Sequence, residues 1–258
     1  MRREVSSQFH FDILDETEDY IVVNKPAPLQ IHPSKPADAG LTLWDGLREV
    51  LAYELVNGGQ ISIINRLDRE TSGLVLIAKN SAAARRFGKA MLRRQIQKSY
   101  RAIVFGWPDW ENVTVDAPIL RAGEVMECPI WVKQIVHENG AACLSEFHVL
   151  EKVSRNGQPF SLVEAKPHTG RMHQLRVHLS HLGFPVVGDK LYGWDDYCYL
   201  EFIETSWTAS LQSRLLLPRQ ALHSHRLEID DAGESLAWEA PFTADLQTFL
   251  DQCEGANV

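Results

Sequence analysis

The order of strand-like and helix-like segments limits what this chain can fold into. Short apolar runs bounded by Pro, Gly and polar residues are typical of strands, and they occur at Tyr20–Val23 and through much of residues 109–165. Helical periodicity appears in residues 42–55, 80–95 and 168–183. Because strands and helices mix without a sustained βαβ alternation, we expect an α+β sheet protein rather than a doubly wound parallel one.

Residues 168–183 change from the period of a strand to that of a helix. Met172, Leu175, Leu179 and Leu182 would share one helical face, and the glycine that follows them is suited to end the helix. Polar side chains would lie together beside that face, and they are His173, Arg176 and Ser180.

Charge is distributed unevenly along a chain whose net charge is −8. Residues 227–258 contain eight acids and no Lys or Arg, so the remainder of the chain is neutral. Residues 71–108 contain no acid and eight cations. Such a run is either a solvated helix face or a track for an anionic polymer. We call the cations that recur every fourth residue in this run the basic stripe, and they are Arg85, Lys89 and Arg93.

Composition and motifs exclude several classes of protein. An apolar content of 45% supports a sizeable core, and the sequence contains no apolar run long enough for a signal peptide or a membrane span. The four cysteines are far apart and form no C-x-x-C pair, which argues against a disulfide framework and a zinc knuckle. The common nucleotide-binding and nucleophile-elbow motifs are missing. We expect a soluble, cytoplasmic protein.

Four histidines stand close together at 168, 173, 178 and 181, as they would in a metal site. His173 and His178 are five residues apart, however, which puts them on different sides of a helix, and no cysteine is near. Capping, packing or polymer-contact roles explain them better, so we expect no metal.

One acid, Asp68, lies in a charged junction between two apolar runs. Arg66 and Arg69 flank it, and neighbouring cations hold a carboxyl in its ionised form. An ionised carboxylate suits a nucleophile or a base and is unsuited to act as a general acid. The residues alone leave three interpretations open: an ordinary charged turn, a catalytic loop, or, together with Glu70, the paired carboxylates of a glycosidase.

Five blocks of the sequence resemble, in order, those of the RluA-type pseudouridine synthases. NRLDRETSGLVLIAK, residues 65–79, is similar to the family's H-R-L-D-x-x-T-S-G loop and the apolar strand after it. HTGRMHQLRVHLSHLGFPVVGDKLYG, residues 168–193, resembles T-G-R-x-H-Q-[IL]-R-V-H-L and the G-D-x-x-Y-G that follows. The resemblance covers roughly residues 12 to 245. The other blocks are DYIVVNKPAPLQIHPS (19–34), QKSYRAIVFGW (97–107) and RQALHSHRLEI (219–229).

This resemblance implies an enzyme that isomerises uridine in RNA, either tRNA or rRNA, to pseudouridine without a cofactor. The implied fold is the pseudouridine synthase catalytic fold, a long, mostly antiparallel mixed sheet with flanking helices. It would form a single catalytic domain over residues 1–258, with Asp68 at the floor of a central cleft between two lobes. We expect this domain to be monomeric.

Site residues follow from the resemblance position by position. Asp68 would be the essential carboxylate, acting as a nucleophile on the anomeric carbon or as a base beside it. Arg176 would pair with Asp68 and keep it ionised, and Tyr100 would lie against the uracil ring and take part in proton transfer. Arg66 would help to displace the flipped nucleotide, and the basic stripe would follow the RNA. The other expected substrate contacts are Arg69, Thr71, Lys98, Arg171, His173 and Gln174.

Two departures from the family pattern affect these expectations. Asn65 stands where the family usually has His, so an amide must replace the imidazole. The small N-terminal RNA-binding domain of many members would be absent, which affects the choice of substrate and not the chemistry. The alternatives to a synthase are a non-catalytic RNA-binding relative and a nucleoside or glycoside hydrolase.

Overall fold

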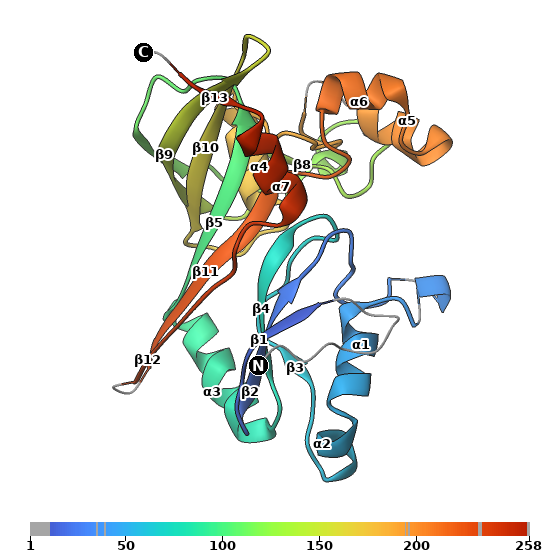
Figure 1. The fold of residues 1–258 in the computed structure, drawn as a ribbon, viewed down its shortest axis with the longest axis vertical. Helices are drawn as coiled ribbons and strands as arrows, with labels where there is room; N and C mark the ends of the chain where they lie inside the picture. Colours follow the sequence, from blue (N-terminus) through green and yellow to red (C-terminus); the bar gives the residue numbers. More distant parts are fainter. Residues whose placement is uncertain are drawn as a thin grey trace. The chain divides into compact units, whose positions relative to one another are not determined.

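The protein contains both helices and strands, and its chain divides into two compact units. Unit 1 comprises Met1–Lys98 and His223–Thr243, and unit 2 comprises Ser99–Leu222 and Ala244–Val258. Both contain sheet and helices (Figure 1), which confirms the predicted α+β class. The computed structural model describes residues 11–34, 36–38, 40–193, 195, 197–231 and 234–256.

Unit 1 is built around a strand that is buried along its whole length, β4 (Ser72–Ala78). On one side β4 pairs antiparallel with β2 (Tyr20–Lys25), and on the other it pairs parallel with β11 (Leu222–Asp231). Because β4 lies inside the sheet, its start is a fixed point from which the preceding loop can present side chains. The remaining strands of unit 1 are β1 (Asp12–Glu16), β3 (Ser62–Ile63) and β12 (Glu234–Glu239).

The helices of unit 1 begin at residues suited to cap them. Thr42 and Asp45 form a capping box at the start of α1 (Leu43–Val50). The helix predicted over residues 42–55 is interrupted at Leu51, after which α2 (Ala52–Val56) continues. The helix predicted over residues 80–95 is α3 (Ser81–Leu92), and Asn80 accepts a hydrogen bond from the Ala83 backbone at its start. The short 3-10 helix η1 (Pro36–Asp38) precedes α1.

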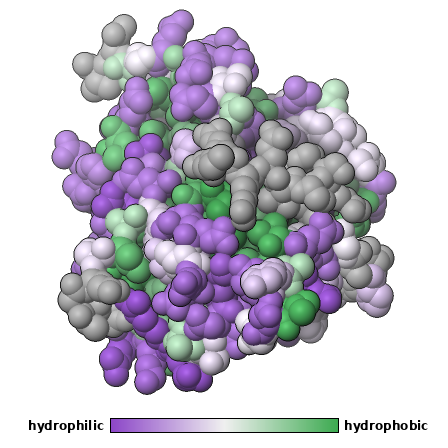
Figure 2. Space-filling model, turned by 60° about the horizontal axis from the view of Figure 1, so that its bottom comes forward, coloured by the Kyte–Doolittle hydropathy of each residue, from purple (hydrophilic) through white to green (hydrophobic). Residues whose placement is uncertain are grey.

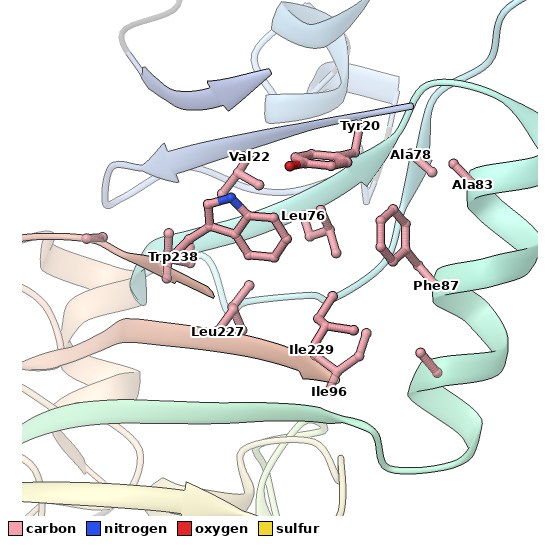
Figure 3. Packing of buried hydrophobic residues seen from close by; sticks show 13 residues of the cluster. Tyr20, Val22, Leu76, Ala78, Ala83, Phe87, Ile96, Leu227, Ile229 and Trp238 are labelled. Atoms are coloured by element: carbon pink, nitrogen blue, oxygen red, sulfur yellow. The ribbon is translucent and has the colours of Figure 1, made fainter. Parts of the chain in front are cut away.

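The core of unit 1 fixes the orientation of α3 (Figure 3). Phe87 is fully buried, and its ring meets that of Tyr20 edge-on at 5.9 Å between centroids. Trp238 of β12 meets the other side of the Tyr20 ring at 5.3 Å. Ala84 and Met91 also pack against this cluster, as the apolar periodicity of α3 predicts. The opposite face of α3 is exposed, and it carries Arg85, Lys89 and Arg93.

Unit 2 contains an antiparallel sheet and the helices of the C-terminal half of the chain. The long strand β10 (Gln158–Pro167) pairs with both β5 (Ile96–Phe105) and β9 (Leu144–Arg155). A separate two-stranded hairpin is formed by β7 (Ile119–Arg121) and β8 (Gln134–Val136). The other elements are β6 (Asn112–Asp116), η2 (Ala122–Glu124), α4 (Gln174–His181), α5 (Tyr197–Thr205), α6 (Ala209–Leu215), α7 (Ala244–Asp251) and β13 (Glu254–Gly255).

The helix predicted within residues 168–183 begins later than its periodicity indicates. Met172 precedes α4 and is 49% exposed, and His173 caps the helix in a left-handed conformation, with φ at 58°. Every residue from Gln174 to Leu179 is buried, and of the residues of α4 only Ser180 and His181 at its end are partly or fully exposed. The apolar stripe therefore misplaced the start of the helix, whereas the glycine at 183, with φ at 85°, follows its end as predicted.

Figure 2 shows hydrophilic side chains over most of the face that it draws, with small hydrophobic areas between them. Within the described part of the chain, no helix combines the length and the apolar character needed to cross a membrane.

Candidate active site

The backbone of the Asp68 loop is fixed by hydrogen bonds at the acid and at the residue that follows it. The Thr71 N–H donates to the Asp68 carbonyl at 3.1 Å, and the Leu29 N–H donates to the Arg69 carbonyl at 3.0 Å. The Asp68 side chain is half-buried, and its neighbours Arg66 and Arg69 are exposed. The loop therefore holds one carboxylate in a partly desolvated position with two cations beside it.

A buried lysine ties this loop to the proline-rich loop that follows β2. Lys25 is fully buried, and its Nζ donates to the carbonyls of Pro26, Leu29 and Arg69 at 2.9, 2.8 and 3.2 Å. Three carbonyl acceptors match the three N–H donors of an ammonium group. Lys25 therefore positions the backbone next to Asp68, a role that we did not predict from the sequence.

Asn65 braces the start of the same loop against β4. Its Nδ2 donates to the Leu74 carbonyl at 2.9 Å, and its Oδ1 accepts from the Leu76 N–H at 2.8 Å. The side chain is 4% exposed, so both hydrogen bonds lie away from water. An amide suits this position because it offers one donor and one acceptor at every pH.

Each residue of the Thr-Ser-Gly turn after the loop is buried or makes a close contact that explains its identity. Thr71 is buried, and the Ser72 hydroxyl lies 2.9 Å from Nδ1 of His223 in β11. Gly73 has φ at 110°, and a Cβ there would lie 2.2 Å from the Ser224 carbonyl oxygen. Only glycine can adopt this conformation and allow the two strands so close together.

Gly73→Ala is expected to destabilise the protein by several kcal/mol, because the added methyl group would push β11 away from β4 and strain the backbone. Gly88→Ala is the matched control, since that glycine lies in α3 with nothing within 4 Å of the added Cβ. The control should stabilise by about 0.5–1 kcal/mol through helix propensity. Urea denaturation of both variants measures the difference. Equal stability of the two would contradict the close approach at Gly73.

In unit 2 the centre of the candidate site is a buried ion pair between Arg176 and Asp189. Arg176 Nε and Nη2 donate to the two Asp189 carboxylate oxygens at 2.6 and 2.8 Å. Burial alone would raise the pKa of Asp189, but the guanidinium and the backbone N–H groups of Leu191 and Tyr192 hold that pKa below its ordinary value. The pair fixes the guanidinium of Arg176 in one orientation.

Tyr192 and His173 complete the surroundings of this guanidinium. The Arg176 guanidinium carbon lies 4.9 Å from the centroid of the Tyr192 ring, a cation–π contact. The Tyr192 hydroxyl lies 2.7 Å from His173 Nδ1 and accepts the Gln134 N–H at 3.0 Å. The backbone of His173 is left-handed, a conformation that costs about 1 kcal/mol or more for a residue other than glycine.

Gln174 orders the loop that precedes α4. Its Oε1 accepts from the Thr169 hydroxyl at 2.8 Å and from the Arg171 N–H at 3.0 Å. Its Nε2 donates to the Leu144 carbonyl and to the Ser145 hydroxyl at 2.8 and 2.9 Å. The Arg171 guanidinium is exposed, and its Nε donates to the Ala142 carbonyl at 3.1 Å. The loop thus presents one cation to solvent on an ordered backbone.

Lys98 and Tyr100 lie two positions apart on β5, so their side chains leave the strand on the same side. Tyr100 is 8% exposed. Lys98 is half-buried, and this burial lowers the pKa of its ammonium group.

One family of enzymes matches a stretch of the sequence that includes parts of both units. The sequence model of the RNA pseudouridylate synthase family matches residues 19–181, more than half of the chain. The chain belongs to this family. It is an RNA pseudouridine synthase, which confirms the activity that the motifs predict.

Related proteins agree with this assignment. Ribosomal large subunit pseudouridine synthase D of Pseudomonas aeruginosa is 32% identical over 95% of this chain and 72% of its own length. An uncharacterized RNA pseudouridine synthase of Chloroflexus aurantiacus is 35% identical over 90% of this chain and 66% of its own. Human RNA Pseudouridylate Synthase Domain Containing 4 is similar in structure, with a TM-score of 0.71, 28% identity, and coverage of 95% of this chain and 94% of that one.

In this synthase three of the four histidines between residues 168 and 181, namely His168, His173 and His178, have polar contacts within the protein. His168 Nε2 lies 3.0 Å from Glu146 Oε1. His178 bridges the Ser145 hydroxyl and the Ala117 carbonyl at 3.0 and 2.9 Å, and burial lowers its pKa. These contacts are those of packing and positioning residues.

Sequence reasoning missed three positioning residues of the synthase, although each lies in a block that carries the resemblance. Asp189 and Tyr192 belong to GDKLYG, a segment in which sequence reasoning assigned no role to any residue. Lys25 belongs to the opening strand. An acid in a mostly apolar stretch, as at Asp189, is a signal for a buried ion pair. Its partner on another segment cannot be read from one sequence.

Asn65→His is expected to make the stability of the synthase depend on pH near neutrality. A neutral imidazole can donate to Leu74 and accept from Leu76, but a protonated one has no acceptor for the Leu76 N–H. The folded state would therefore lower the pKa of this histidine below its unfolded value of about 6.5. Stability would be retained above that pH and lost below it, by up to about 1.4 kcal/mol per pH unit. Melting temperatures of the variant and of wild type at pH 5.5 and pH 8 test this. The prediction would be contradicted if the two proteins differed in melting temperature by the same amount at both pH values.

Proposed function

We propose that this synthase modifies uridine in ribosomal RNA of the large subunit, with Asp68 as the essential carboxylate. The observation that carries the choice of RNA is the 32% identity, over 95% of the chain, to a protein named for the large ribosomal subunit. The choice of Asp68 is supported by its loop, in which Asn65 and Lys25 fix the backbone on both sides of one half-buried acid.

The reaction requires the enzyme to break one bond and form another without net gain or loss of atoms. The bond between C1′ of the ribose and N1 of the uracil breaks, the base turns, and a bond forms between C1′ and C5. The proton on C5 must then leave, and N1 gains a proton. Tyr100 is the proposed group for proton transfer at C5, since it is a buried phenol on the same side of β5 as Lys98.

Asp68 can assist this exchange of bonds at C1′ either as a nucleophile or as a base. As a nucleophile, its carboxylate would attack C1′ and hold the sugar while the base turns. As a base, it would remove a proton from the sugar beside C1′ and return it after the new bond has formed. Both routes require Asp68 in its ionised form.

Arg176 is the proposed partner that keeps Asp68 ionised. Asp189 holds Nε and Nη2 of the guanidinium. In this arrangement Asp189 is a positioning residue, because it acts on Asp68 through Arg176. The proposed contacts with the RNA are Arg66, Arg69, Lys98, Arg171 and His173, whereas the buried Thr71 and Gln174 are proposed to position the loops that carry these contacts.

The test is pseudouridine mapping after incubation of the purified protein with unmodified large-subunit rRNA, small-subunit rRNA and a pool of tRNA transcripts. We expect discrete modified positions in the large-subunit rRNA and none in the other two. Modification of tRNA alone would overturn the choice of RNA and leave the chemistry intact. Sedimentation of the same preparation tests the proposed monomer.

The basic stripe is the proposed path for the RNA backbone outside the catalytic residues. Replacing Arg85, Lys89 and Arg93 with Gln should weaken binding to RNA of any sequence, because each cation displaces condensed counterions. The slope of log affinity against log salt should become shallower by about 0.7 per contact on single strands, or about 2 in all. Titrations at several salt concentrations measure this slope. Arg48→Gln, on the exposed side of α1, is the control and should leave it unchanged.

A solvated helix face would give equal slopes for wild type and the triple variant. That result would require another path for the RNA. Turnover at saturating RNA should survive in the triple variant, since no residue of the stripe belongs to the catalytic set.

A further inference from the structure

The tip of the hairpin between β7 and β8 exposes aromatic and apolar side chains that the catalytic residues do not use. Trp131 is 75% exposed, and Met126 and Val125 nearby are 57% and 44% exposed. Tryptophan is highly buried on average, so an indole left this far in solvent indicates a surface that binds something.

Arg121 lies against one face of this indole. Its guanidinium carbon is 3.6 Å from the centroid of the Trp131 ring, and its Nε is 3.5 Å from Glu124 Oε1. With a guanidinium over one face, the large exposure of Trp131 must come from its other face and its edges. An aromatic ring with one open face and a cation behind it is suited to stack on an unpaired base, which has a π-face and carries a phosphate nearby.

The hairpin is joined directly to the surroundings of Arg176 within unit 2. Arg121 pairs with Gln134 across the two strands, and the Gln134 N–H donates to the Tyr192 hydroxyl. Tyr192 in turn packs its ring against the Arg176 guanidinium. Trp131 is therefore carried by the element that also supports the proposed catalytic arginine.

A second cation is anchored on the other side of the same hairpin. Ile119 of β7 forms a bridge with Ala141, and the next residue, Ala142, accepts a hydrogen bond from the exposed Arg171. A cation and an open aromatic face on neighbouring segments fit one chemistry, that of a single-stranded nucleotide.

We propose that Trp131, backed by Arg121, is a stacking platform for an unpaired nucleotide that flanks the target uridine. This inference rests on the proposed function, since the ligand is part of the RNA substrate. It adds a binding subsite outside the catalytic set. The platform takes any base, because stacking requires a π-face and no particular hydrogen-bonding edge.

The experiment uses the full-length enzyme and an RNA fragment that contains its target uridine, with an abasic nucleotide placed in turn at each flanking position. Trp131→Ala should raise KM about 5- to 100-fold on the intact fragment, with kcat unchanged, as expected for the loss of one stack. Trp131→Phe should recover most of the affinity. Tyr197→Ala is the matched control, because that ring is 74% exposed on α5 of the same unit, and it should behave as wild type.

The abasic series identifies the partner of Trp131. One abasic position should raise KM for wild type by about the same factor as Trp131→Ala, and should add nothing further in that variant. A normal KM for Trp131→Ala, or losses that simply multiply at every position, would overturn the platform. The latter result would assign Trp131 to packing of the hairpin or to a protein partner. Wild-type turnover on the intact fragment separates this outcome from failure of the proposed function, which would show no turnover at all.

Discussion

Asp68→Asn should abolish pseudouridine formation, with a loss of at least about a thousandfold in turnover, while the fold and the affinity for RNA are retained. The substitution keeps the shape of the side chain and removes its charge, so neither route at C1′ remains open. The loop should stay in place because Asn65 and Lys25 brace its backbone on both sides of Asp68. Melting temperature, RNA binding and pseudouridine yield should be measured on one preparation.

The retained fold makes this result interpretable. A variant that melts with wild type and binds RNA normally, but forms no pseudouridine, has lost only the chemistry. Substantial turnover by such a variant would remove Asp68 from its proposed role. Loss of folding would instead show that the carboxylate supports the loop.

Arg176→Met should remove activity and also destabilise the enzyme by about 3–5 kcal/mol, because it leaves Asp189 buried without its cation. The second substitution Asp189→Asn removes that buried charge, and its Oδ1 can still accept from Leu191 and Tyr192. The double variant should therefore recover much of the stability and none of the activity. Chemical denaturation and turnover of both variants check this. Recovery of activity in the double variant would show that Arg176 has a structural role only.

The contribution of Asp189 to the pH dependence of stability should have opposite signs in wild type and in Arg176→Met. In wild type the pKa of Asp189 lies below its unfolded value of about 3.9, so its contribution is present above that pH and is lost as the pH falls further. In Arg176→Met the uncompensated buried carboxyl has a raised pKa, so the variant should become more stable as the pH falls from 8 to 5. Stability that is flat over this range in the variant would contradict the burial of an uncompensated charge.

The elements that sequence reasoning found are those with a local physical signal. The cap at Asn80 and the apolar period of residues 80–95 placed α3, and two apolar runs placed β3 and β4 around Asp68. Each depends on neighbours within a few residues, and the structure confirms them.

What sequence reasoning missed depends on contacts between distant segments. Arg176 meets Asp189, thirteen residues further along, in a stretch without regular structure. The first six residues of α4 are all buried, so its apolar stripe carried little information about which face is inside. The need for glycine at residue 73 comes from Ser224 on β11, far away in the chain. Such constraints become visible only once the strands are paired.

Tritium release from RNA labelled at C5 of uridine tests the central claim most directly, because forming the bond between C1′ and C5 expels the hydrogen at C5. Wild type should release tritium to water and leave one pseudouridine in the RNA for each uridine that reacts, and Asp68→Asn should release none. Release of free uracil by wild type, or equal tritium release by Asp68→Asn, would contradict an isomerase that depends on Asp68.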